Sequence, residues 1–160
     1  MYLYLRKQEY HCGGSWHSEE EQEKAKYPKE LAELEAEIKG RNFPSVSIDT
    51  DYQVGYWRKA NAIHKWFIDN CADGVDKGQD IYVSQKKAQE LLDKCNEVLT
   101  NRLLAEKKLP TQSGFFFGSI KYDESYFEDI EYTKHILEKV IAFIESEEGK
   151  YYRIIYYANW

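Results

Sequence analysis

The 160-residue sequence has only three cysteines, and their arrangement excludes a disulfide-stapled fold. Cys12, Cys71 and Cys95 are odd in number and include no Cys-x-x-Cys pair. Disulfide frameworks use paired cysteines, so this pattern is typical of reduced thiols in a cytoplasm. We therefore predict a cytoplasmic protein without a disulfide scaffold.

Long apolar segments and an excess of positive charge are also missing. No apolar run approaches the roughly 18 residues of a membrane-spanning helix, and the opening MYLYLRKQEY lacks the pattern of a secretion signal. The formal net charge of −6 argues against general nucleic-acid binding, because such binding needs a basic surface. We expect no membrane partner and no general affinity for nucleic acid.

Motifs for cofactors, metals and catalysis are missing as well. The sequence has no glycine-rich phosphate-binding loop. His11, Cys12 and His17 lie close together, but their spacing matches no common zinc pattern. Cys12 or Cys71 could pair with His64 as a nucleophile and its base, but the sequence shows no third group that would orient the histidine. We predict no metal, no cofactor and no catalytic residue; this favours a non-enzymatic protein and leaves an unrecognised enzyme open.

Aromatic residues, by contrast, make up 16% of the chain, and many lie near its two ends. Residues 2–8 alternate tyrosine and leucine with the period of a strand, and residues 151–158 are rich in aromatic and β-branched residues. These two segments predict an antiparallel pair, to which residues 45–48 or 81–83 add a third strand. The tyrosines are also compatible with a sheet edge that forms a homodimer.

The sequence between the ends predicts helices with recognisable caps. Ser18 precedes Glu21 at capping-box spacing, and Ser84 is suited to cap a helix over about 85–103. The pairs Thr50/Gln53 and Ser125/Glu128 predict helices over 51–70 and from 125 onward in the same way. We expect one α+β domain over residues 1–160, mainly helical, with a small antiparallel sheet pairing the N- and C-terminal strands. An all-α bundle with loosely attached ends is the alternative.

The segment VGYWRKANAIHKWF carries the main functional hypothesis. On a helix over 51–70 its aromatic and polar residues would divide into an apolar face and a mixed face. An arginine fork, a lysine charge and an indole ring together suit an anion beside a flat ring. The residues of this mixed face are Trp57, Arg58, Asn61, His64 and Lys65. The alternative is a helix flank whose cations pair with nearby acids.

A second candidate stretch is SGFFFGS, in which glycines bracket three phenylalanines. Neighbouring side chains of an extended segment point to opposite faces, so Phe115, Phe116 and Phe117 cannot all enter the core. We predict that they form a lid or wall beside the mixed face, or alternatively a plug of the core.

The segments YWRKANAIHKWF and SGFFFGS, followed by YDESYFEDIEYT, resemble a family of small uncharacterised proteins encoded by phages and prophages. The similarity covers roughly residues 51–145. The resemblance implies a small accessory role in the cytoplasm of a bacterial host, and it assigns no chemistry to individual residues.

Three function hypotheses follow. The first is a counter-defence protein that sequesters an anionic, ring-containing small molecule, such as a nucleotide-derived signal, or that docks on a host protein through the same surface. The second is an acidic inhibitor of a nucleic-acid-binding host protein, based on the net charge and the Glu-rich stretches 19–36 and 123–148. The third is a nucleotide-processing enzyme.

Overall fold

The structure is a computed structural model that describes residues 1–114 and 118–159. It divides into two compact units: Met1–Arg6 with Asp51–Trp160, called here the main unit, and Lys7–Thr50, called the hairpin unit. The strands β1 (Tyr2–Cys12) and β2 (Ser45–Tyr56) each contribute residues to both units. Because the two units share both strands, this division does not test the expectation of one domain over residues 1–160, which stays a prediction.

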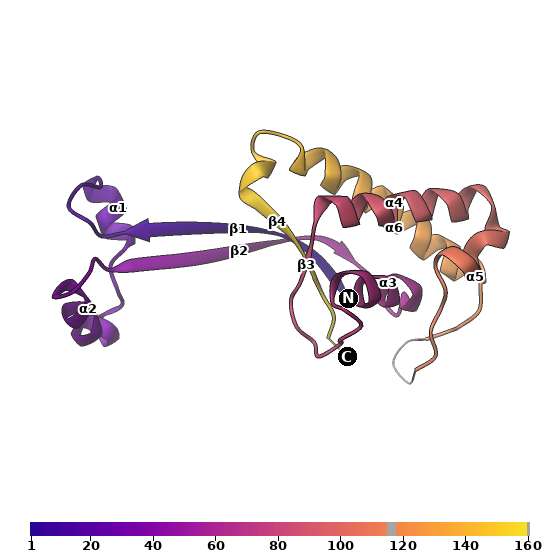
Figure 1. Cartoon of the computed structure of the whole chain (residues 1–160), viewed down its shortest axis with the longest axis horizontal. Helices are drawn as coiled ribbons and strands as arrows, with labels where there is room; N and C mark the ends of the chain where they lie inside the picture. Colours follow the sequence, from indigo (N-terminus) through magenta and orange to yellow (C-terminus); the bar gives the residue numbers. More distant parts are fainter. Residues whose placement is uncertain (115–117, 160) are drawn as a thin grey trace. The chain divides into compact units, whose positions relative to one another are not determined.

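The predicted fold class is confirmed: helices predominate, and the two chain ends pair in an antiparallel sheet. Four strands lie in the order β2-β1-β4-β3, so β4 (Tyr152–Tyr157) lies beside β1 (Figure 1). The third strand expected at 81–83 is β3 (Ile81–Val83), which pairs antiparallel with β4. The strand expected at 45–48 is the start of β2.

The core of the main unit lies between one face of this sheet and three helices. These are α3 (Asn61–Cys71), α4 (Gln85–Thr100) and α6 (Glu124–Ile144), and α4 packs along α6 (Figure 1). Alternate strand residues such as Leu3 and Ile154 are buried against them. Ser84 caps α4 as predicted, since its Oγ accepts the Lys87 N–H. A short helix, α5 (Ala105–Lys108), follows α4.

Two predicted helix starts are wrong. The capping box at Thr50 and Gln53 is not used, because residues 51–56 belong to β2 and α3 begins only at Asn61. The pairing of β2 with β1 stabilises the strand. This pairing continues one residue beyond β2, where the Trp57 N–H donates to the Met1 carbonyl at 2.9 Å. For α6, the cap is Asp123 rather than Ser125, and its carboxylate accepts the Tyr126 N–H at 3.3 Å.

The hairpin unit carries two short helices between its strand segments. α1 (Glu19–Lys24) is capped by Ser18 as predicted, and α2 (Ala32–Lys39) follows a 3₁₀ turn over Lys29–Leu31 and ends at Gly40. Neither helix contains a buried residue. In the part of the chain that the structure describes, no helix is long and apolar enough to span a membrane.

Candidate functional site

The structure does not bring the five predicted site residues of the mixed face together. Trp57 and Arg58 precede α3 instead of lying on it, so the helical face that would align them with Asn61 and His64 does not exist. Trp57 is 2% exposed, and its indole N–H donates to the Thr133 hydroxyl on α6 at 2.9 Å. Trp57 is therefore part of the core.

His64 is buried at 1% exposure and is held between two partners. Its Nε2 lies 3.0 Å from an Asp76 carboxylate oxygen, and its Nδ1 lies 2.8 Å from the Tyr156 hydroxyl. A carboxylate only accepts, so Nε2 carries the proton and Nδ1 accepts from the tyrosine. Burial lowers the His64 pKa, while Asp76 opposes that shift. His64 thus links Asp76, in the loop that precedes β3, to Tyr156 of strand β4 through two hydrogen bonds.

Lys65 lies apart from Arg58 and forms an i,i+4 ion pair with Asp69 at 2.6 Å, the flanking arrangement named above as the alternative. It lines a small hollow of about 100 Å³ with Lys94 and Lys108. Trp66 lines the same hollow, and its buried indole N–H has no hydrogen-bond partner among the described residues.

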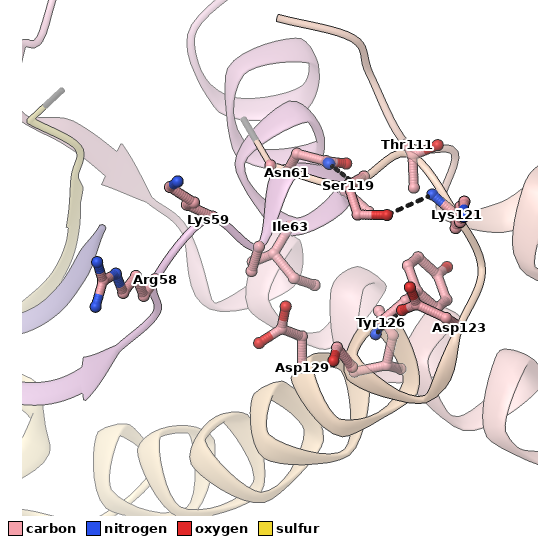
Figure 2. Close-up of a pocket in the computed structure, with 15 residues that line it drawn as sticks. Arg58, Lys59, Asn61, Ile63, Thr111, Ser119, Lys121, Asp123, Tyr126 and Asp129 are labelled. Carbon is pink, nitrogen blue, oxygen red and sulfur yellow. Dashed lines mark hydrogen bonds between the residues drawn. The ribbon is translucent and has the colours of Figure 1, made fainter. Parts of the chain in front are cut away.

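Arg58 and Asn61 do share a pocket, which lies at the first turns of α3 and α6 and has a volume of about 170 Å³. We call it the first-turn pocket (Figure 2). Its walls also include the segment around Ser119 and Lys121. The residues that line it are Arg58, Lys59, Ala60, Asn61, Ala62, Ile63, Thr111, Gly118, Ser119, Lys121, Asp123, Ser125, Tyr126, Asp129 and Ile130.

Asn61 fixes one wall of this pocket. Its side-chain amide donates to the Ser119 carbonyl at 2.6 Å and accepts the Gln112 N–H at 3.2 Å. On the other side, the Tyr126 hydroxyl donates to the Leu109 carbonyl at 2.8 Å. Hydrogen bonds therefore join Gln112 and Ser119 to α3, and Leu109 to α6.

Two residues of the pocket have backbone conformations in the left-handed region. Lys59 has φ +64° and Gly118 has φ +77°, and a Cβ on Gly118 would lie 3.1 Å from the Lys59 Cβ. A lysine in this conformation is disfavoured by about 1 kcal/mol, and such strain tends to concentrate at functional sites. No sequence pattern predicted this backbone conformation.

The charges of the pocket combine an inner carboxylate with outer cations. Burial, and then the nearby Glu128 carboxylate, raise the pKa of Asp129 to about 6. Figure 2 places Asp129 between Arg58 and Lys59 on one side and Lys121 on the other. The tips of Arg58 and Lys59 point away from the pocket centre, so they need to rotate to reach a ligand.

These charged groups lack internal partners in the described ranges, 1–114 and 118–159. The Asp129 carboxylate has no hydrogen bond or ion pair there, and Arg58, Lys59 and Lys121 have no ion pair. The sequence pattern pointed to Arg58 and Asn61 but not to Asp129, because only tertiary packing brings the start of α6 to the residues that precede α3.

The remaining candidates are the three phenylalanines, the cysteines and the potential metal ligands. Phe115, Phe116 and Phe117 lie outside the described residues. Burial raises the pKa of Cys71 to about 11 and that of Cys95 to about 12, so neither forms much thiolate near neutral pH. No group of three or more potential metal ligands occurs within the described part of the chain.

Comparisons of the chain with protein-family models, with curated proteins and with solved structures gave no match.

Proposed function

We propose that this protein binds a small anionic, ring-containing molecule, such as a nucleotide-derived signal, in the first-turn pocket. The observation that carries the proposal is a ring-sized space with an unpaired carboxylate inside and three unpaired cations around it, within the described residues. We assign binding rather than catalysis, because the pocket brings no nucleophile–base pair together among those residues.

The volume of the pocket sets the size of the ligand part that enters. An apolar cavity of about 150 Å³ holds one benzene molecule. The first-turn pocket, at about 170 Å³, is therefore large enough for a single ring and too small for a whole nucleotide. The charged part of the ligand would stay at the rim, where Arg58, Lys59 and Lys121 are exposed.

Asp129 supplies the specificity in this arrangement. With a pKa of about 6, its carboxyl is largely ionised at pH 7.5 and accepts a hydrogen bond from a ring N–H or an exocyclic amine. Nucleobases carry such donors. Arg58 offers a planar fork that binds phosphate or carboxylate in a bidentate way.

The biological setting is part of the proposal and is supported by the resemblance to phage proteins. A protein that sequesters a nucleotide-derived signal would act as a counter-defence factor in the cytoplasm of the bacterial host.

Isothermal titration calorimetry with a defined panel tests the binding. The panel contains the four ribonucleoside 5′-monophosphates, a cyclic dinucleotide, and inorganic phosphate as the ring-free probe. We expect at least one nucleotide to bind and phosphate to bind far more weakly. Arg58→Ala should weaken nucleotide binding by roughly tenfold or more, in line with the loss of a charge-assisted contact.

Lys65→Ala is the matched control, because Lys65 is close in sequence but lines a different hollow and is paired with Asp69. It should leave the dissociation constant unchanged. Absence of binding by every nucleotide, or equal effects of the Arg58 and Lys65 variants, would overturn the proposal.

A further inference from the structure

The helix α2 of the hairpin unit has an unusual orientation for an amphipathic helix. Leu34 is 54% exposed, whereas the side chain of Glu35 is only 15% exposed. A surface helix normally buries its apolar stripe and exposes its acids. Leu34 and Glu35 reverse this order, and no residue of α2 is buried.

The exposed apolar residues of this region have the spacing of a recognition helix. Leu31 ends the 3₁₀ turn that precedes α2, and Leu34 and Ile38 lie on the helix. Their positions are i, i+3 and i+7, the pattern with which an amphipathic helix enters a partner's groove. Leu31 and Leu34 are exposed and Ile38 is half-buried beside a hollow of about 420 Å³. We call these three residues the α2 stripe.

Acidic residues flank the α2 stripe on one side. Glu33 and Glu37 lie four positions apart on α2 and form a row parallel to Leu34 and Ile38, and Glu30 precedes them in the 3₁₀ turn. Within the hairpin unit, which the structure describes completely, none of the three forms an ion pair. The row is therefore available to a charged partner.

The charge of the whole unit has the same sign. Residues 7–50 contain ten acidic and six basic residues, a formal charge of −4, whereas the rest of the chain contains 18 acidic and 16 basic residues, a charge of −2. Such a surface repels nucleic acid and anionic membranes. It also repels a second copy of itself, which leaves a basic protein as the complementary partner.

An exposed aromatic pair lies in the same unit. Trp16 is 67% exposed, and its ring lies 4.4 Å from that of Phe43 in an edge-to-face arrangement. Phe43 also lines the hollow beside Ile38. Tryptophan is enriched among the residues that dominate binding energy at protein interfaces, so an exposed Trp16 suits an anchor.

We infer that α2 is a docking helix for a protein whose hydrophobic groove is rimmed by Lys and Arg. The α2 stripe enters the groove, and the row of Glu30, Glu33 and Glu37 meets the basic rim. This inference is independent of the first-turn pocket, because it uses only residues of the hairpin unit.

Photo-crosslinking identifies the partner. A photoreactive phenylalanine analogue replaces Leu34 in the full chain, and crosslinked proteins from a bacterial extract are identified by mass spectrometry. The same analogue at Tyr82, an exposed residue of β3 in the main unit, is the control. The identified protein is then purified, and its dissociation constant is measured with the full chain by calorimetry.

We expect a partner with an isoelectric point above about 9, captured from position 34 and not from position 82. Leu34→Asp should raise the dissociation constant by roughly tenfold or more, as for an interface anchor. Glu33→Lys with Glu37→Lys should also raise it and reduce its dependence on salt. Tyr82→Asp should leave it unchanged, and the melting temperature of Leu34→Asp should equal that of the wild type.

Three outcomes would overturn the inference. One is the absence of any protein captured preferentially at position 34. Another is a purified partner that is acidic, or one whose dissociation constant is unchanged by Leu34→Asp. The third is capture of a second copy of the chain, with self-association in size-exclusion chromatography that Leu34→Asp abolishes, which would make the α2 stripe a homodimer contact.

Discussion

The main unit and the hairpin unit use similar residues in opposite ways. In the main unit, large apolar side chains such as Phe67 and Leu91 are fully buried, and helices cover one face of the sheet. In the hairpin unit, Trp16 and Leu34 are exposed and neither helix buries a residue. Phe67 and Leu91 therefore contribute to stability, whereas Trp16 and Leu34 form part of an accessible surface.

The largest effect that tests this contrast is the change in the free energy of unfolding when a tryptophan of each unit is replaced by alanine. Trp57→Ala should lower the free energy of unfolding by about 4 kcal/mol, because it leaves a cavity and removes the partner of the Thr133 hydroxyl. Urea denaturation followed by circular dichroism measures the loss.

The control is the corresponding change in the other unit. Trp16→Ala should change the free energy of unfolding by no more than about 0.5 kcal/mol, because that ring is mostly exposed. Equal losses in the two variants would contradict the division into a packed unit and an exposed surface.

A second prediction concerns the buried histidine of the main unit. His64→Ala should cost about 3 kcal/mol at pH 7.5, since it leaves the Asp76 carboxylate without one donor and the Tyr156 hydroxyl without its acceptor. Urea denaturation at fixed pH measures this loss, and Lys65→Ala, with its exposed ion pair, should cost less than about 0.5 kcal/mol.

The same histidine gives a pH dependence of known sign. The pKa of His64 is lowered in the folded state from its ordinary 6.5, so below pH 6.5 the unfolded chain binds more protons than the folded one. The contribution of His64 to stability is complete above pH 6.5 and is lost as the pH falls. Thermal melts between pH 5 and 8 should show a shallower acid loss in His64→Ala, and a parallel profile would contradict this role.

The smallest effect concerns Asp129. Its raised pKa means that ionisation disfavours the folded state, so the cost is absent below pH 3.8 and complete above about pH 6. Asp129→Asn should therefore raise the free energy of unfolding at pH 8 by about 1 kcal/mol, a value discounted for the partial exposure of the carboxyl. The gain should disappear in melts at pH 4.

Glu131→Gln, an exposed acid on the same helix, serves as the control and should change stability by less than about 0.3 kcal/mol at either pH. A stabilising effect of the same size in both variants would indicate relief of net negative charge rather than a property of the first-turn pocket.

Patterns within short stretches of sequence predicted several elements correctly. Alternation identified the first strand, and aromatic and β-branched composition identified the last. The side chains of Ser18 and Ser84 cap the helices that they were expected to cap. These signals are local, because a strand's period and a cap's hydrogen bond involve residues a few positions apart. The pairing of the two ends followed because neither strand is stable alone.

The same local signals misled at residues 51–56. A capping-box match predicted a helix there, whereas residues 51–56 form part of β2 and pair with β1. This pairing joins residues some fifty positions apart, so a local pattern could not predict it. The mixed helical face that depended on this helix was lost with it.

The sequence by itself determined the fold class, most helices and the acidic character of residues 7–50. Only the tertiary structure decided that Trp57 and His64 are buried, that Arg58 and Asp129 line one pocket, and that Leu34 is exposed. Those facts depend on which segments pack together in three dimensions, and burial, pKa and pocket volume arise only from that packing.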